Sequence, residues 1–334
     1  MSKKWKVISF GLGPIGASIA RLAILRNDQI ELVGAVDSNP VLVGKDLGSI
    51  VGLDRSTGIT VRPTAEGLYE RADIVLHATT SFLSTTKNQL IEFCQNGVDV
   101  VSTCEELAYP WFGHAEIARE IDYAARKEGV TLLGTGVNPG FVLDVLAITL
   151  SGICTGVTQI RATRILDATK RRLPFQSKVG VGLNLEQFEE NLRTGKFGHI
   201  GLPESIAMTC AALNFSPERI EQRISAKIAT VPVPTEHFGM IEAGHVLGLV
   251  QDAKAYFKER KIATYHIEMY AGAKDAHDEI ELIGNPRISL RIPGGTPGDT
   301  ATAAIMINSV PRVVEAAPGL LTVKDIRPAS SVLM

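Results

Sequence analysis

The chain has 334 residues, of which 45% are hydrophobic and 21% charged, so it can bury the cores of two globular domains. These proportions exclude a disordered, collagen-like or coiled-coil protein. The 34 basic and 36 acidic side chains give a formal net charge of −2, with no extended basic run. This balance argues against a nucleic-acid partner and favours a small ligand of low charge.

The cysteines and the apolar stretches indicate the cell compartment. Glycines interrupt the apolar run near the start, unlike a secretion signal, and the longest uncharged stretch elsewhere, 145–160, has 16 residues. A bilayer span needs about 20 residues. We therefore expect a cytoplasmic protein without a membrane partner. Four widely spaced cysteines with no CxxC pair are expected to be free thiols and no metal site: Cys94, Cys104, Cys154 and Cys210.

The part of the chain before residue 142 alternates short β-branched runs with amphipathic segments. This pattern is typical of a parallel sheet covered by helices on both faces. The sequence therefore predicts an α/β fold that begins with a doubly wound domain. Strands are expected at 5–11, 30–37, 60–62, 74–78, 98–102 and 131–134, and helices at 15–26, 85–96 and 114–127.

The pattern changes after Asp144, where long strand candidates are no longer each followed by a crossover helix. This order predicts an α+β domain with a largely antiparallel or mixed sheet. A last helix at 300–315 is expected to return to the first domain, which gives segments 1–142, 143–299 and 300–334. Strands are expected at 157–166, 224–232, 263–270, 279–283 and 287–292, and helices at 144–151, 185–193, 203–213 and 241–259.

A glycine-rich segment joins the first predicted strand to the first predicted helix. The first glycine permits a tight turn, the second lets backbone approach a pyrophosphate, and the third lets the helix pack on the strand. Since a helix N-terminus favours an anion, the segment predicts a dinucleotide cofactor. FAD is disfavoured because the chain lacks room for a separate flavin-binding insertion. The residues are Gly11, Gly13, Pro14, Ile15 and Gly16.

An acidic residue at the end of the second predicted strand bears on the choice of cofactor. Asp37 lies 21 residues after Gly16, where a carboxylate can accept hydrogen bonds from both ribose hydroxyls. It would repel a 2′-phosphate, so NAD is favoured, although the adjacent Ser38 and Asn39 would tolerate NADP. An ordinary turn or capping role before Pro40 is the alternative.

Small hydroxylic residues follow the fourth predicted strand. Ligands of open α/β sheets bind at the carboxyl ends of the strands. We therefore expect Thr79, Thr80 and Ser81 to line the nicotinamide side of a cofactor site. A capping role for the helix expected at Thr85 is compatible with this one.

Several further segments carry a resemblance to a known family. They are 102–110 (STCEELAYP), 136–141 (GVNPGF) and 294–302 (GGTPGDTAT), joined by 198–205 and 308–311. In this order, and with the glycine-rich segment, they make most of the chain similar to the 2,4-diaminopentanoate dehydrogenases and related native amine dehydrogenases.

The resemblance implies an NAD(P)-dependent oxidative deamination of a primary amine to a ketone or aldehyde plus ammonia, and the reverse reductive amination. The amine would be 2,4-diaminopentanoate or a simple amine. The implied fold is a Rossmann domain joined to a dihydrodipicolinate-reductase-like domain, in a homodimer, with the active site between the domains. An acidic residue after the fifth strand handles ammonia in this family, and the motif places this role on Glu105, with Glu106 as the alternate.

The chemistry of the reaction fits a glutamate at this place. A partly desolvated glutamate has a raised pKa and can move protons near neutral pH as an amine adds to a carbonyl and water leaves. The alternative for Glu105 and Glu106 is a helix cap or a solvated position, which is usual for adjacent acids.

Candidate contacts with the substrate follow the last strand of the first domain. Asn138 can hydrogen-bond the nicotinamide amide or the substrate, and Phe141 can supply an apolar wall. The alternatives are a tight turn for Asn138 and core packing for Phe141.

The second domain supplies two further candidates. Arg164 could bind a substrate carboxylate through a bidentate pair, which would favour an amino-acid-like amine, although surface arginines are the default. His199 lies between glycines in an expected loop, which favours a pocket role over a core one, although a lone histidine is usually structural or exposed. The other arginines considered for the carboxylate are Arg161, Arg171 and Arg172.

Two other functions remain open at this point. One is another dehydrogenase or reductase of the dihydrodipicolinate-reductase-like group. The second is a non-catalytic NAD(P)-binding redox sensor, because a fold does not establish an activity.

Overall fold

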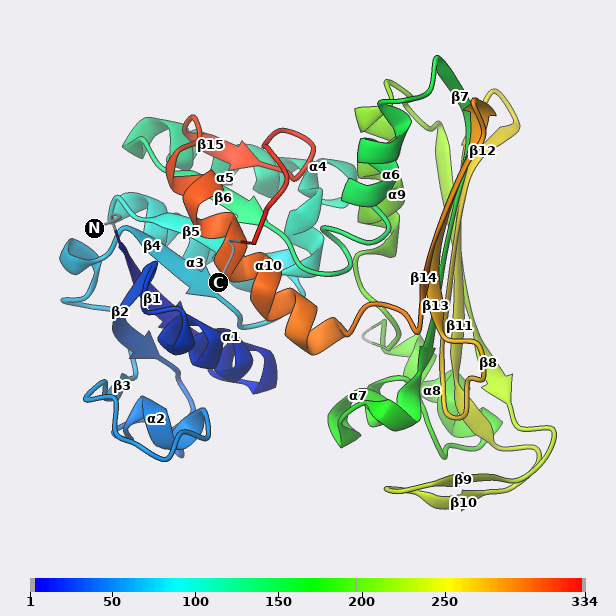
Figure 1. Cartoon of the computed structure of the whole chain (residues 1–334), viewed down its shortest axis with the longest axis horizontal. Helices are drawn as coiled ribbons and strands as arrows, with labels where there is room; N and C mark the ends of the chain where they lie inside the picture. Colours follow the sequence, from blue (N-terminus) through cyan, green and yellow to red (C-terminus); the bar gives the residue numbers. More distant parts are fainter. Residues whose placement is uncertain (1–3, 196, 332–334) are drawn as a thin grey trace. The chain divides into compact units, whose positions relative to one another are not determined.

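A computed structural model describes residues 4–195 and 197–331. The chain divides into two compact units, Met1–Phe141 together with Pro297–Met334, and Val142–Thr296. Each unit has its own sheet (Figure 1).

The first unit contains a parallel sheet with strand order β15-β6-β5-β4-β1-β2-β3. Consecutive strands step outward from β1 in both directions, which is the doubly wound arrangement. The predicted α/β fold is therefore confirmed. The strands are β1 (Trp5–Phe10), β2 (Ile30–Val36), β3 (Val61–Arg62), β4 (Ile74–His77), β5 (Asp99–Ser102), β6 (Thr131–Gly134) and β15 (Gly319–Leu321).

Helices cover this sheet in two pairs. Helix α1 (Pro14–Leu25) packs against α10 (Gly298–Val314), and α3 (Leu83–Gln95) packs against α5 (Ala115–Glu128) (Figure 1). Buried side chains of α3 and α5 share one core with strands β4 to β6. Shorter helical turns complete the unit: α2 (Leu47–Ile50), η1 (Tyr69–Arg71), η2 (Glu105–Ala108) and α4 (Pro110–Gly113).

The second unit is built on a mixed sheet with strand order β14-β13-β7-β12-β11-β8. β7 and β12 run parallel, and their neighbours pair antiparallel, as the α+β prediction requires. The strands are β7 (Gly156–Asp167), β8 (Arg219–Ile228), β11 (Val246–Phe257), β12 (Arg260–Tyr270), β13 (His277–Asn285) and β14 (Ile288–Pro293), beside a hairpin of β9 (Val233–Thr235) and β10 (Gly239–Ile241).

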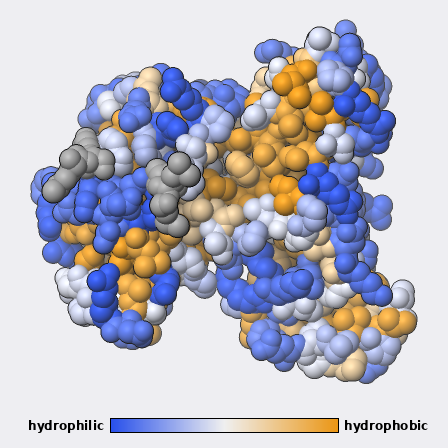
Figure 2. All heavy atoms as spheres, in the orientation of Figure 1, coloured by the Kyte–Doolittle hydropathy of each residue, from blue (hydrophilic) through white to orange (hydrophobic). Residues whose placement is uncertain are grey.

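One face of this sheet is packed by helices. Helix α6 (Val145–Ser151) contacts β7 and β13, and α9 (Leu202–Ala212) contacts β8, β11 and β12. Most residues of α9 are buried, and apolar atoms gather over the α6 and α9 region in the space-filling view (Figure 2). The remaining turns are η3 (Ala168–Lys170), α7 (Leu173–Lys178) and α8 (Leu185–Arg193).

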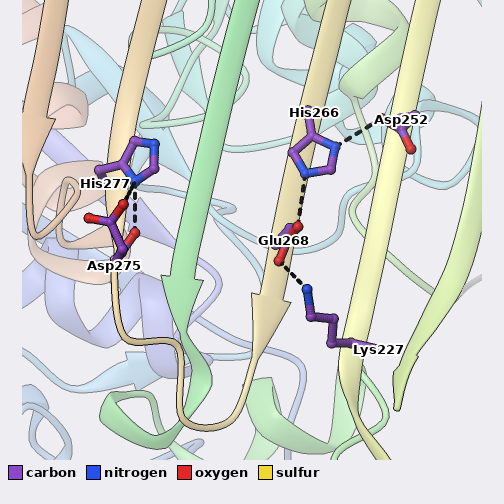
Figure 3. Close-up of polar contacts among 6 residues, drawn as sticks. All are labelled: Lys227, Asp252, His266, Glu268, Asp275 and His277. Atoms are coloured by element: carbon purple, nitrogen blue, oxygen red, sulfur yellow. Dashed lines mark hydrogen bonds and ion pairs between the residues drawn. The ribbon is translucent and has the colours of Figure 1, made fainter. Parts of the chain in front are cut away.

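The opposite face of the sheet carries charged side chains that contact one another, both between strands and within one segment of chain. His266 lies between Asp252 and Glu268, at 2.9 and 3.1 Å, and Lys227 donates to Glu268 at 2.8 Å (Figure 3). His277 contacts the carbonyl and carboxylate of Asp275 (Figure 3). The contacts of His266 with Asp252 and of Lys227 with Glu268 join different strands and stabilise this half-exposed sheet face.

The helix predicted at 241–259 is wrong, because most of this segment is strand β11. Alanine, lysine and glutamine favour a helix intrinsically, but from Leu249 onward burial alternates with a period of two: Leu249, Gln251, Ala253 and Ala255 are buried, and the residues that follow each of them are not. Pairing with β8 and β12 on either side overrides the local preference. The strand expected at 224–232 begins earlier, at Arg219, and ends at Ile228.

In the described part of the chain, no helix combines the length and apolar character that a bilayer span requires. All four cysteines are free thiols.

Candidate active site

The three glycines of the turn between β1 and α1 differ in what surrounds them. A Cβ on Gly11, whose φ is +88°, would lie 2.4 Å from the carbonyl oxygen of Ala78, and one on Gly16 would lie 1.9 Å from that of Gly11. A side chain at either position would collide with nearby backbone, so the packing of the chain itself requires glycine at both. A Cβ on Gly13 would meet nothing within 4 Å. The turn thus leaves space beside the N-terminus of α1, where a dinucleotide diphosphate would fit.

Asp37 follows β2 and ties its end to the glycine-rich turn. One carboxylate oxygen accepts from the backbone N–H of Leu12 at 2.6 Å, and the other from Asn39 at 2.8 Å. The turn role considered from the sequence is therefore present. These two donors also fix the direction of the carboxylate, and its contact with a ribose stays a prediction.

The segment after β4, which we call the cofactor loop (78–82), packs against the glycine-rich turn. Ala78 donates its N–H to the carbonyl of Phe10 at 2.8 Å. Thr79 is exposed, and Thr80 and Ser81 are half-buried. The three hydroxylic residues therefore lie at the carboxyl edge of the sheet, where open α/β sheets bind ligands.

The segment after β5, which we call the acidic loop (103–106), is bonded directly to the cofactor loop. The carbonyl of Ser81 accepts from the Cys104 thiol at 3.3 Å and from the N–H of Glu106 at 3.2 Å. The predicted cofactor contacts and the predicted acidic residues thus lie side by side. This follows from the parallel pairing of β4 with β5, which sets His77 opposite Ser102.

The two adjacent glutamates have different surroundings. Glu106 accepts from the backbone N–H of Leu83 at 2.7 Å and lies 3.1 Å from Nε2 of His114. It therefore caps α3, which begins at Leu83 rather than at Thr85 and has no side-chain cap from its own N-cap residue, Phe82. Oε2 of Glu105 is shielded from solvent.

Cys104 lies between these loops, and its environment argues against a nucleophile. Burial raises the pKa of its thiol to about 12, and the charges of Glu106 and Glu105 act in the same direction. A thiol in this state is inert near neutral pH. Cys104 therefore packs as a small buried residue.

Asn138 and Phe141 belong to a compact turn after β6. Asn138 is buried and Phe141 is half-buried. A Cβ on Gly140, whose φ is +126°, would lie 2.4 Å from the backbone nitrogen of Gly136. The tight turn considered for Asn138 is therefore present, and its contact with cofactor or substrate stays a prediction.

Arg164 is part of an internal ion pair of the second unit. Its guanidinium donates to Asp278 at 3.0 Å and to the carbonyl of Thr296 at 2.8 Å, and the two side chains are 2% and 1% exposed. Asp278 also accepts the N–H of Thr296 at 2.7 Å. The arginine thus has partners inside its own unit, and a substrate carboxylate would have to compete with them. Of the other candidates, Arg161 pairs with Glu281 and Arg171 lies over the ring of Phe175.

His199 is held through its backbone by one buried side chain. The amide of Gln251 accepts from the N–H of His199 at 3.0 Å and donates to its carbonyl at 2.8 Å. Burial, together with the positive charges of Lys178 and Arg164, lowers the pKa of His199 to about 3. The imidazole is therefore neutral at physiological pH and can serve as a hydrogen-bonding group rather than as a cation.

Two buried polar residues near these candidates were missed in the sequence. His77 ends β4, and Gln251 is in the middle of β11; both are 0% exposed. His77 follows three apolar residues in β4, and Gln251 lies between Leu249 and Ala253 on the buried face of β11. A buried polar side chain must find a partner, and for His77 the apolar run before it was the available signal.

The family is shown by comparison with known proteins. The model of the 2,4-diaminopentanoate dehydrogenase C-terminal domain matches residues 141–334. The 2,4-diaminopentanoate dehydrogenase of Acetoanaerobium sticklandii is 30% identical over 332 residues, which cover 97% of this chain and 94% of the relative. An amine dehydrogenase of Streptomyces virginiae is 25% identical, with 96% of each chain covered.

Solved structures agree with this relationship. The amine dehydrogenase from Mycobacterium smegmatis superposes with a TM-score of 0.84 at 25% identity, covering 99% of this chain and 98% of that one. A dipicolinate-bound dihydrodipicolinate reductase from Paenisporosarcina sp. TG-14 has a TM-score of 0.53 at 13% identity, covering 97% and 99%, and shares the fold. The chain belongs to the 2,4-diaminopentanoate dehydrogenase family of oxidoreductases.

Proposed function

We propose that this protein is an NAD(P)-dependent amine dehydrogenase that converts a primary amine and water to a carbonyl compound and ammonia, and catalyses the reverse reductive amination. The observation that carries the proposal is the bonding of the acidic loop to the cofactor loop. It brings Glu105 to the carboxyl edge of the sheet that also carries the glycine-rich turn. Family membership supports the same chemistry.

The nicotinamide cofactor would supply the hydride acceptor, and the residues of the first unit fit it. The open space at Gly13 and the N-terminus of α1 would hold the diphosphate, with Pro14 and Ile15 at the start of the helix. Asp37 would receive the ribose hydroxyls, which favours NAD over NADP. The hydroxyls of the cofactor loop and the amide of Asn138 would orient the nicotinamide.

Glu105 would handle the protons of the reaction. In the deamination direction its carboxylate takes a proton from the substrate ammonium group, because hydride leaves the carbon only when the nitrogen lone pair is available. Glu105 then releases this proton to solvent, takes a proton from the water that adds to the C=N carbon, and returns it to the nitrogen so that ammonia leaves. The shielding of Oε2 of Glu105 from solvent supports this role, because a poorly solvated carboxylate takes up a proton more readily.

The substrate has two candidate classes. The relative from A. sticklandii is named for 2,4-diaminopentanoate, an amine that carries a carboxylate. The internal ion pair of Arg164 favours a substrate without a carboxylate, a plain amine or carbonyl compound, because the guanidinium already has two partners. We propose neutral His199 as a hydrogen-bonding contact and Phe141 as an apolar contact for either class.

The test is NAD(P)H consumption in the presence of ammonia. 2-Amino-4-oxopentanoate is compared with small unfunctionalised ketones and aldehydes, each with and without ammonia. Consumption that requires ammonia supports the proposal, and the preferred carbonyl compound separates the two substrate classes. Consumption independent of ammonia would instead indicate a carbonyl reductase. Tight NADH binding with no turnover on any carbonyl compound would indicate a redox sensor.

A homodimer in the cytoplasm is part of the same proposal. Light scattering on the purified chain checks the dimer, since a dimer has twice the mass of 35.9 kDa. A monomeric mass at assay concentration would contradict it.

A further inference from the structure

A buried histidine stands between the two loops of the candidate site. His77 is the last residue of β4 and is 0% exposed. Its ring is packed against Phe10 and Phe93, with centroids 5.8 Å from each. An imidazole enclosed in this way has to satisfy both nitrogens within the protein.

Both nitrogens have close partners. Nδ1 lies 2.8 Å from the hydroxyl of Ser102, and Nε2 lies 3.0 Å from Oε1 of Gln89 and 2.9 Å from the hydroxyl of Thr79. Ser102 ends β5 and Thr79 belongs to the cofactor loop. One ring therefore connects the ends of two neighbouring strands.

The direction of each hydrogen bond follows from the acceptors. The carbonyl oxygen of Gln89 can only accept, so Nε2 of His77 carries the proton and Nδ1 is the acceptor. The hydroxyl of Ser102 must then donate to Nδ1, and its oxygen accepts the N–H of Cys104 at 3.1 Å. Burial lowers the pKa of His77 to about 4, so the ring remains neutral near pH 7.

The two ends of this chain of hydrogen bonds lie at functional segments. On one side, Cys104 precedes Glu105 in the acidic loop. On the other side, Cγ2 of Thr79 lies close to the glycine-rich turn, 3.1 Å from the position of a Cβ on Gly11. The hydroxyl of Thr79 also donates to Oε1 of Gln89 at 3.3 Å, which anchors this end on α3.

We propose that His77 is a positioning residue that holds the cofactor loop through Thr79 and the acidic loop through Ser102. The proposal rests on the function proposed above. It adds that cofactor affinity and proton handling depend on the two separate sides of one imidazole. His77 itself touches neither cofactor nor substrate.

Two substitutions separate the two sides of the ring. The short amide of His77→Asn can replace Nδ1 and keep the bond to Ser102, but it does not reach Thr79. The longer amide of His77→Gln can replace Nε2 and keep Thr79 and Gln89, but it leaves the Ser102 hydroxyl without its acceptor. Both variants lose ring packing, so a loss of stability common to both is expected.

The readouts are the Kd for NADH, measured by fluorescence without substrate, and kcat at saturating cofactor. For His77→Asn we expect a Kd raised by about ten-fold with kcat changed by less than about three-fold, the scale of one lost hydrogen bond. For His77→Gln we expect the reverse, a kcat lowered by about ten-fold and a nearly unchanged Kd. Phe93→Leu is the matched control, because it disturbs the same core and no polar partner of His77. It should lower Tm and leave Kd and kcat at the assay temperature unchanged.

Equal changes in both histidine variants, or a lower Tm alone, would overturn the proposal, because a purely structural role gives no division between Kd and kcat. Should these variants not fold, Gln89→Leu and Ser102→Ala interrupt the same two sides and are expected to raise Kd and lower kcat, respectively. If the wild-type chain binds NADH but turns over no amine or carbonyl compound, the proposed function fails. The Kd measurements still decide the Thr79 side of the inference in that case.

Discussion

Glu106 accepts a hydrogen bond from the backbone N–H of Leu83, 2.7 Å away, across 23 residues of sequence. The acid at the alternate position therefore stabilises the start of α3 and binds His114 with the same oxygen. This relationship distinguishes two adjacent glutamates, of which the family resemblance favours Glu105 and keeps Glu106 as the alternate. It gives the cap to Glu106 and leaves Glu105 as the residue proposed for the proton chemistry.

Glu105→Gln should remove turnover and spare cofactor binding. The amide has the shape of the carboxylate but cannot take a proton, so we expect kcat to fall by about two orders of magnitude or more. The Kd for NADH should stay within about two-fold, because the substitution leaves the glycine-rich turn intact. Steady-state rates and fluorescence titration check the two values, and retained turnover would remove Glu105 from the mechanism.

Glu106→Gln should mainly reduce stability. The substitution replaces a charge-assisted contact at a helix N-terminus by a neutral one, so we expect a loss of about 1 kcal/mol in the free energy of unfolding. Urea denaturation measures it. A larger loss of kcat here than in Glu105→Gln would exchange the roles of the two acids.

The glycines of the first turn should separate folding from cofactor binding. Gly16→Ala places a Cβ 1.9 Å from the carbonyl oxygen of Gly11, so we expect a strongly destabilised or insoluble chain. Gly13→Ala meets no atom within 4 Å and should fold with a Tm near that of the wild type. Its methyl group points into the space assigned to the diphosphate, so NADH affinity should fall by about ten-fold or more. Normal NADH affinity in folded Gly13→Ala would move the cofactor away from this turn.

The doubly wound half of the fold could be predicted because its strands are local features. Short apolar runs bounded by glycine and acidic residues mark β1, β2, β4, β5 and β6 within one or two residues. β15 could not be found in this way. It has three residues, and it exists because Leu320 donates to Asp122 of α5 and the strand pairs with β6.

The site could be predicted from the sequence only where a short motif determines the conformation of the backbone. The glycine-rich turn is such a case, since Gly11 and Gly16 are required by close contacts with the backbone of Ala78 and of Gly11 itself. The cap on α3 and the contact of His77 with Ser102 depend on the pairing of β4 with β5, which brings residues 23 and 25 positions apart into contact. The helix expected at 241–259 failed for the same reason, because its buried face is set by neighbouring strands.

Removing one partner of the buried pair of Arg164 and Asp278 should lower the free energy of unfolding more than removing one partner of an exposed pair. Arg164→Met leaves the carboxylate of Asp278 buried without its cation, so we expect a loss of about 3 to 5 kcal/mol in the free energy of unfolding. Arg161→Met is the matched control from the same strand. Its partner Glu281 is near the surface and the Arg161 side chain is 53% exposed, so the loss should be below about 1 kcal/mol.

The same variants test the substrate prediction. Combining Arg164→Met with Asp278→Leu removes both charges of the buried pair. If this double variant recovers most of the lost stability, the enzyme can be assayed without the arginine. An unchanged KM for a carboxylated substrate relative to a plain one would then show that Arg164 is a structural residue. A selective rise in KM for the carboxylated substrate would restore it as a substrate contact.

Asp99, at the start of β5, should make stability depend on pH. Burial raises its pKa from 3.8 to about 6, against the opposing hydrogen bond from the N–H of Thr131 and with a smaller contribution from the charge of Asp73. Because the folded pKa lies above the unfolded one, the protonated form favours the fold. This stabilisation is complete below about pH 4 and is lost as the pH rises through about 6.

Asp99→Asn keeps an acceptor for Thr131 and carries no charge, so at pH 7.5 it should be more stable than the wild type by about 2 kcal/mol. The difference should vanish at pH 4, whereas exposed Asp54→Asn should change stability little at either pH; a stabilisation by Asp99→Asn that is equal at both pH values would contradict the assignment.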